Sequence, residues 1–339
     1  MSNDHGNGGI STAIKKLREW IADESEPTMS FNLLQDLETV LGIAEESIEL
    51  MKEGDAFKPL IESILTSDNF INRLVDRMAK SGYPPLVINI ATKSKIPTFA
   101  DQAVQHRNTE TLAGVEFLWI PTGKFLMGSS GHHANEQPIH RVQITSPFWL
   151  GKYPVTNSQY AKFMAATGHR EPQHWNDQKT NHPQQPVVGV SWDDAQSFCR
   201  WLGDGYRLPT EAAWEYACRA GTTTAYSFGD DLSKLGDHVW FSGNSGGQSQ
   251  PVGSYPANIW GLCDMHGNAW EWCADWYGVD YYSKSPPADP TGPKFGNRRV
   301  LRGGSWGNLA DNCRSACRDH VQPDNRDSFI GFRVAKTQL

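Results

Sequence analysis

The chain has 339 residues, which is long enough for two domains and a sizeable hydrophobic core. A formal net charge of -7 without Lys- or Arg-rich runs argues against a dedicated nucleic-acid-binding protein. No apolar run approaches the roughly 20 residues that span a membrane, and the polar start MSNDHGNGG contains no apolar signal segment. We therefore expect a cytoplasmic protein that binds neither nucleic acid nor membrane, and whose cysteines are mostly thiols.

The first part of the chain predicts a small helical domain. Residues 1–9 are polar and Gly-rich, as is typical of a disordered leader. Three amphipathic helices are expected within residues 10–93, because apolar residues recur there at helical spacing. These helices contain no chemical motif, so we interpret the domain as a module that binds a partner protein or oligomerises. Residues 94–111 are polar without a sustained period and are interpreted as a linker.

The pattern changes at residue 112, where short apolar runs broken by Gly, Pro and Asn replace the helical stripes. Residues 115–129 predict a β-hairpin around Pro121-Thr122-Gly123. Three helices should follow. They cover residues 157–167, the segment from the N-cap Ser191 to residue 202, and a segment that starts at Pro209-Thr210 and stops at Gly221. The remaining chain is expected to be mostly irregular, which makes residues 112–339 an α+β domain.

The segment of about 298–335 alternates a frame with apparently free positions. Its frame is rich in Arg, Gly and Trp, a mixture typical of strands and turns held by guanidinium hydrogen bonds to backbone carbonyls. The frame arginines are Arg302, Arg314, Arg318, Arg326 and Arg333. The free positions are Gly307, Asn308, Leu309, Ala310, Asp311, Cys317, Asp319, His320, Val321, Gln322, Asp327, Ser328 and Phe329. Unpatterned insertions in a rigid frame predict loops that present a recognition surface.

Several motifs carry a family resemblance. They are FLMG, YPVTN, PVVGVSW, YRLPTEAAWEYACRAG, GLCDMHGNAWEWCADW, LRGGSW and GFRVA, in this order along the chain. Together they resemble the sulfatase-modifying-factor domain of formylglycine-generating enzymes over residues of about 112–336. The resemblance implies a C-type-lectin-like fold, often with a structural Ca²⁺ ion.

The resemblance implies a calcium site at Asp264, Gly267, Ala269 and Glu271, with two carboxylates and two backbone carbonyls as ligands. Hard oxygen ligands on a tight turn suit Ca²⁺. The alternative is a turn whose carboxylates accept hydrogen bonds from backbone amides. The family's other calcium segment corresponds to residues 238–253, which contain no acidic residue, so we expect no ion there.

Copper chemistry is not expected. In copper-dependent members of the family two cysteines hold the metal, and their positions correspond here to Asn308 and Cys313. A single thiol cannot form the two-coordinate thiolate site of Cu(I). Cys317 could substitute as the second thiol, but its spacing differs from the family pattern. The simpler interpretation of Cys313 is a small buried apolar residue.

A second possible metal cluster comprises His132, His133, His140 and Glu136. Their spacing fits none of the usual zinc patterns, so we expect a solvated loop instead. The chain contains no nucleophile elbow, phosphate-binding loop or dinucleotide-binding motif.

The final segment also resembles the variable proteins of diversity-generating retroelements, through RGGSW, NCRSA, PDNR and IGFRV. In that family adenine-templated mutagenesis converts AAC codons into any NNC codon. Twelve of the thirteen free positions carry residues that NNC can encode, Gln322 being the exception. The resemblance implies a non-enzymatic protein that binds an unknown protein or small molecule. The residues expected to contact that ligand are Asn308, Leu309, Asp311, Cys317, Asp319, His320, Val321, Asp327, Ser328 and Phe329.

Two alternatives remain open. One is a formylglycine-generating-type oxidoreductase acting on a peptide cysteine, which Asn308 disfavours. The other is a structural member of the lectin-like family without a diversified face.

Overall fold

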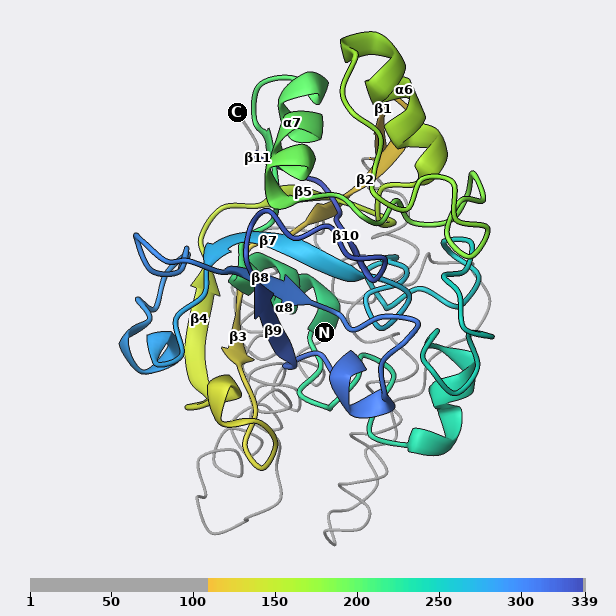
Figure 1. Ribbon diagram of the computed structural model, residues 1–339. Coiled ribbons are helices and arrows are strands. Elements are labelled where there is room, and N and C mark those ends of the chain that lie inside the picture. The colour runs from red at the N-terminus through yellow and green to blue at the C-terminus, as the bar shows by residue number, and fades with distance from the viewer. Residues whose placement is uncertain (1–108, 338–339) are drawn as a thin grey trace, which may run out of the picture. The chain divides into compact units, whose positions relative to one another are not determined.

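The computed structural model describes residues 109–337. The leader, the predicted helical domain 10–93 and most of the predicted linker lie outside the described residues. The described chain forms three sheets and three α-helices (Figure 1). The helices are α6 (Asn157–Thr167), α7 (Trp192–Leu202) and α8 (Glu211–Arg219).

The largest sheet has five strands in the order β1-β2-β5-β11-β6. Its strands are β1 (Thr109–Leu112), β2 (Val115–Ile120), β5 (Phe148–Gly151), β11 (Ala335–Thr337) and β6 (Tyr206–Arg207). β1 pairs antiparallel with β2 and begins inside the segment that we assigned to the linker. Its sequence TETL carries one apolar residue, so an edge strand of this kind leaves almost no hydrophobic signal.

The predicted hairpin over residues 115–129 is wrong, although both of its strands exist. β2 pairs with β1 and β5, whereas β3 (Gly123–Met127) pairs with β4 (His140–Ile144) in a separate two-stranded sheet. Most of β2 is buried, as expected of a strand with a partner on each side. The Pro-Thr-Gly signal specifies a turn but not the strand that becomes the partner.

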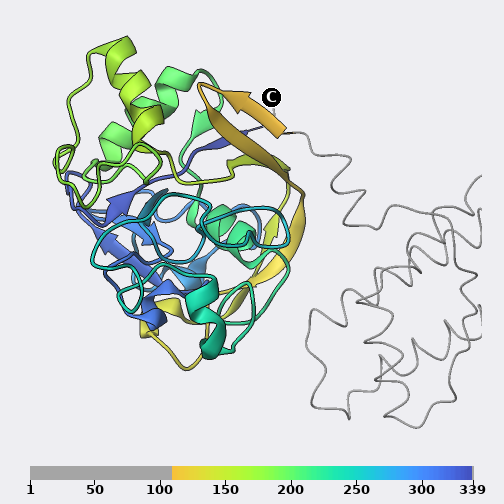
Figure 2. The same ribbon diagram turned by 90° about the vertical axis from the view of Figure 1, so that its right-hand side faces the viewer.

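A four-stranded sheet has the order β10-β7-β8-β9. Its strands are β10 (Ile330–Gly331), β7 (Trp270–Trp276), β8 (Arg299–Arg302) and β9 (Arg318–Val321). The C-terminal part is therefore more regular than predicted, because three of these strands come from residues 298–335. Figures 1 and 2 agree in placing β8, β9 and the 3-10 helix η5 (Ala310–Cys313) on one side of the domain.

The three predicted helices are confirmed, as are the N-cap Ser191 and the start signal at Thr210, and Thr156 is a further N-cap that was not predicted. Thr156 and Ser191 each form a capping box with the residue three positions later, and Thr210 caps α8 through the Ala213 N–H. Their side-chain oxygens satisfy amide groups that the first helical turn leaves unpaired. The predicted stop is one residue late, because Ala220 takes the left-handed conformation (φ 45°) before Gly221.

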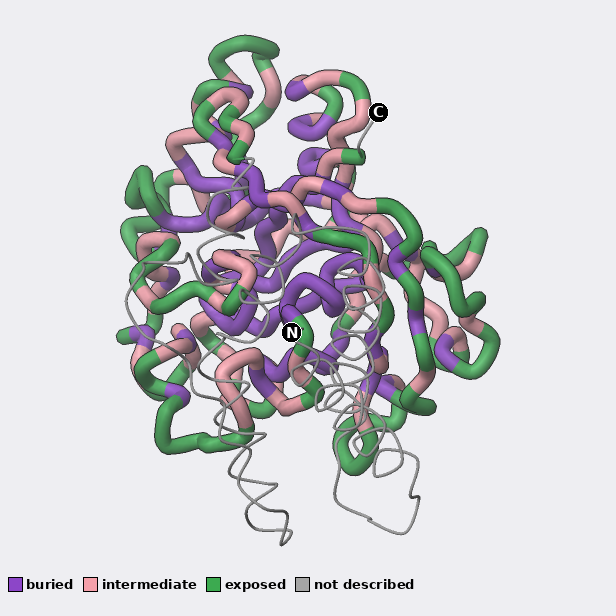
Figure 3. The backbone as a smooth tube through the Cα atoms, turned by 180° about the vertical axis from the view of Figure 1, so that it is seen from behind, coloured by how far each residue is buried: buried purple, intermediate pink, exposed green. Residues whose placement is uncertain are grey.

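Helix α8 lies at the centre of the domain, and every one of its residues is buried. In Figure 3 the buried segments cross the middle of the domain, while exposed loops surround them. Two large apolar clusters fill this interior, with Trp214 in one and Trp272 in the other, both fully buried. Within residues 109–337 we find no helix with the length and apolarity needed to cross a bilayer.

Candidate functional site

The frame of the C-terminal segment is held by four arginines that are buried together with their carboxylate partners. Ion pairs exposed to water contribute little to the free energy of unfolding. In the interior, removal of one partner is strongly destabilising because the other charge stays buried and unpaired. The pairs are Arg302 with Glu215, Arg314 with Glu136, Arg318 with Glu211, and Arg333 with Glu271.

Hydrogen bonds to backbone carbonyls were predicted for the five frame arginines, which are these four and Arg326. Four of the five form such bonds. Arg302 donates to the carbonyls of Ala316 (2.8 Å) and Cys317, and Arg318 donates to that of Asn135 (2.8 Å). Arg326 and Arg333 also donate to carbonyls. Arg314 differs, because its hydrogen bonds go to the carboxylates of Glu136 and Asp311.

The carboxylate partners were missed from the sequence. Glu211 and Glu215 are four residues apart on α8, so both lie on one face of a helix whose other residues, apart from Arg219, are apolar or aromatic. That spacing inside an apolar helix is the signal that could have revealed buried ion pairs. Burial alone would raise the pKa of Glu215, but the guanidinium groups of Arg219 and Arg302 hold the pKa below its usual value.

The free positions lie between these anchors and, with one exception, reach the surface. Twelve of the thirteen are exposed or half-buried, while Ser305, Arg314, Ser315, Ala316 and Arg318 around them are buried. Leu309 is 72% exposed. We call residues 307–311, 319–322 and 327–329 the binding face.

The first and last parts of the binding face meet. The Trp306 and Phe329 rings lie 4.5 Å apart between centroids, and Trp306 Nε1 donates to the Ser328 carbonyl (3.3 Å). The Asn308 side chain is fixed by a hydrogen bond, because its Oδ1 accepts from the Ser305 hydroxyl (2.6 Å). Residues 307–308 and 327–329 therefore form one continuous surface.

The middle part of the binding face belongs to β9, at the edge of its sheet. Asp319 is exposed, and the His320 ring lies 3.7 Å from the Tyr277 ring between centroids. His320 Nδ1 also lies 3.2 Å from an Arg298 guanidinium nitrogen. Val321 packs partly against the neighbouring apolar cluster.

Cys317 is the exception among the residues that we expected to contact a ligand. Its side chain is 2% exposed, and burial raises the pKa of its thiol to about 12. The backbone explains this position, because Cys317 immediately precedes Arg318 and its carbonyl accepts from buried Arg302. Cys317 therefore lies beneath the binding face.

The loop of His132 and His133 is only partly solvated, contrary to our expectation. His132 and His133 are half-exposed, and both contact the Asp311 carboxylate. Glu136, however, is fully buried and accepts from Arg314 at 2.8 Å through each oxygen. The ion pair with Arg314 accounts for its burial.

Cys313 is fully buried, and burial raises the pKa of its thiol. Asn308, at the position of the other cysteine of copper-dependent enzymes, has a half-buried amide side chain instead of a thiol. All six cysteines of the chain are free.

The four residues of the implied calcium site lie on the turn before β7 and at its start. Asp264 accepts from the Gly253 amide (2.7 Å) and from Asn268 (3.2 Å). Both oxygens of Glu271 accept from Arg333 at 2.7 Å. Burial raises the pKa of Asp264 to about 6, although the Gly253 amide and Arg333 favour its charged form. The Gly253 hydrogen bond is the contact that the alternative, a turn whose carboxylate accepts from a backbone amide, predicts.

The chain is similar in sequence to known proteins. Residues 101–338 match the family described as the sulfatase-modifying factor enzyme 1-like domain. The chain is 30% identical to the serine/threonine-protein kinase pkn1 of Chlamydia caviae over 96% of its own length and 51% of the kinase. It is 35% identical to the formylglycine-generating enzyme of Streptomyces coelicolor, covering 64% of this chain and 87% of that one. The chain thus spans about half the length of the curated kinases that it matches.

Among solved structures, Treponema denticola variable protein 1 is similar, with a TM-score of 0.61 and 28% sequence identity. The match covers 68% of this chain and 99% of that protein. The predicted C-type-lectin-like α+β fold is confirmed. The chain belongs to the family of the sulfatase-modifying factor enzyme 1-like domain.

Proposed function

We propose that this chain is a non-enzymatic ligand-binding protein that presents a diversified surface at its C-terminus. One observation carries the proposal: the frame residues are buried in ion pairs, while all free positions except Cys317 reach the surface between them. Such an arrangement lets side chains change without disturbing the core. The similarity to Treponema denticola variable protein 1 supports it.

The chemistry of the binding face suggests the kind of ligand that it takes. Leu309 is an apolar side chain that is 72% exposed, so a ligand that covers it would gain from burying apolar surface. Asp311, Asp319 and Asp327 add acidic groups, which favour ligands with basic or hydrogen-bond-donor groups. In this proposal the predicted helical domain 10–93 connects recognition to a partner protein or multiplies the number of faces by oligomerisation.

The test is codon-by-codon deep sequencing of the last 120 nucleotides of the gene across one population. We expect changes at the codons of Asn308, Leu309 and Asp319 and at the other binding-face codons. The codons for RGGSW, CRSA and GFRV serve as internal controls and should stay constant, because their side chains are mostly buried. A segment that does not vary would contradict the diversified face.

An alternative function is oxidation of a peptide cysteine, which the similarity to formylglycine-generating enzymes favours. The buried thiol of Cys313 and the amide of Asn308 argue against it. Incubation of the chain with Cu(I), molecular oxygen, a thiol reductant and a cysteine-containing peptide distinguishes the two functions. Aldehyde formation that disappears in C313S would support the enzyme, and its absence would support the binding protein.

We also propose a structural Ca²⁺ ion at Asp264, Gly267, Ala269 and Glu271. Calcium chloride added to the chelator-treated chain should raise its melting temperature, because binding to the folded state alone is stabilising. D264N should lose this increase, whereas D319N, at an exposed position, should keep it. An equal melting temperature with calcium and with chelator would rule the ion out.

A further inference from the structure

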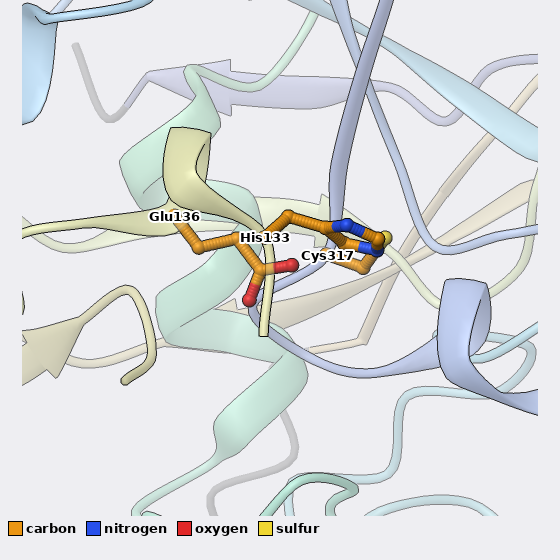
Figure 4. Close-up of side chains that lie close together, drawn as sticks. All are labelled: His133, Glu136 and Cys317. Atoms are coloured by element: carbon orange, nitrogen blue, oxygen red, sulfur yellow. The ribbon is translucent and has the colours of Figure 1, made fainter. Parts of the chain in front are cut away.

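Three potential metal ligands from distant parts of the chain meet beneath the binding face. They are His133, Glu136 and Cys317, shown in Figure 4. One ligand atom of each lies within 4.8 Å of the others. In the sequence the histidine loop and Cys317 are far apart, and neither half meets a usual metal pattern by itself.

Two hydrogen bonds from side chains to backbone carbonyls hold the halves together. Arg318, which follows Cys317, donates to the Asn135 carbonyl (2.8 Å), and Asn135 Nδ2 donates to the Arg318 carbonyl (3.3 Å). Glu136 is fixed by its two hydrogen bonds with Arg314. Two of the three ligands are thus buried and positioned before any ion arrives, and His133 covers them from a half-exposed position.

The charges of the site suit a divalent cation. Glu136 and Asp311 contribute two negative charges and a Cys317 thiolate a third, while Arg314 contributes one positive charge. While Cys317 is a thiol these groups sum to a net charge of −1, and loss of the thiol proton on metal binding makes it −2, which matches a divalent ion. The Cys317 thiol must release its proton to water when the metal binds.

The ligand types select the ion. Sulfur, imidazole nitrogen and carboxylate oxygen together suit Zn²⁺, whereas Ca²⁺ takes oxygen ligands. With Zn–S near 2.3 Å and Zn–N near 2.0 Å, ligand atoms of a tetrahedral site are about 3.5 Å apart. The ligand atoms therefore need to move together by about 1 Å when the ion binds.

We propose that His133, Glu136 and Cys317 form a Zn²⁺ site, with a water molecule in the fourth position. His133 Nε2 lies 3.3 Å from Asp311, so donation to that carboxylate leaves Nδ1 as the metal ligand. A carboxylate that orients a metal-binding histidine is a common arrangement. Asp311 and Cys317 are both free positions of the segment, so a variant in which Cys317 is replaced would lose the site.

The experiment uses the full chain, reduced and freed of metal, titrated with Co²⁺ as the spectroscopic probe. We expect a thiolate-to-cobalt charge-transfer band in the near ultraviolet and the visible bands of a tetrahedral site. Zn²⁺ should remove both sets of bands, and excess Ca²⁺ should not. H133Q should weaken cobalt binding at least about tenfold, and C317S should abolish the charge-transfer band.

The variants distinguish this site from other cysteines. C263S alters a buried cysteine outside the cluster and should leave the spectrum unchanged. H133Q keeps the proposal testable if C317S fails to fold, because His133 is half-exposed. A spectrum without the charge-transfer band, or one that H133Q leaves unchanged, would overturn the zinc site.

Discussion

Replacing Arg302 by alanine should destabilise the C-terminal domain by about 3–5 kcal/mol, because Glu215 would remain buried without this partner. Arg302 is fully buried, and it also holds the Ala316 carbonyl at 2.8 Å. Its loss would therefore release the strand that leads to the binding face. Urea unfolding followed by tryptophan fluorescence measures this effect, because twelve of the 13 tryptophans follow residue 110.

R298A is the matched control for R302A. Arg298 lies just before β8 but is exposed, so its loss should change the free energy of unfolding by less than about 0.5 kcal/mol. L309A on the binding face should be equally neutral. If R302A changes the free energy of unfolding as little as R298A and L309A do, the buried ion pairs do not stabilise the frame.

Replacing Asp275 by asparagine should stabilise the protein more at pH 8 than at pH 5. Burial, followed by the nearby Glu211 carboxylate, raises the pKa of Asp275 from 3.8 to about 7, and Arg318 and Arg207 only partly oppose this. The folded state therefore binds this proton more tightly than the unfolded state. The stabilisation is complete below about pH 4 and is lost as the pH rises through about 7.

The full linkage would amount to about 4 kcal/mol for a shift of about three pKa units. In D275N the new amide oxygen can still accept from the Glu211 amide, as the Asp275 carboxylate does at 2.8 Å. We expect D275N to gain about half of the full linkage energy at pH 8. Urea unfolding at pH 5 and pH 8 gives the two values. D319N, at an exposed position, should leave the pH dependence as it is. An identical pH dependence in D275N and in the unchanged protein would contradict the prediction.

Sequence reasoning succeeded where the determining signals are local. The caps at Thr156, Ser191 and Thr210 act within three residues, so the helices and their starts were predictable. The order of the motifs indicated the family, and the alternation of frame and free positions indicated which positions reach the surface. The strand pairings were not predictable to the same degree, because a turn between β2 and β3 fits several partners.

The sequence by itself determined the family, the three helices of the described domain and the position of the candidate face. Only the tertiary structure decided which carboxylate neutralises each arginine, that Cys317 lies beneath the face, and that His133 and Glu136 lie beside it. Arg314 and Glu136 are 178 positions apart, and no periodicity or cap relates residues over that distance. Such contacts form because burying a charge without an opposite charge is strongly unfavourable. Which opposite charge lies close enough depends on how the whole domain packs.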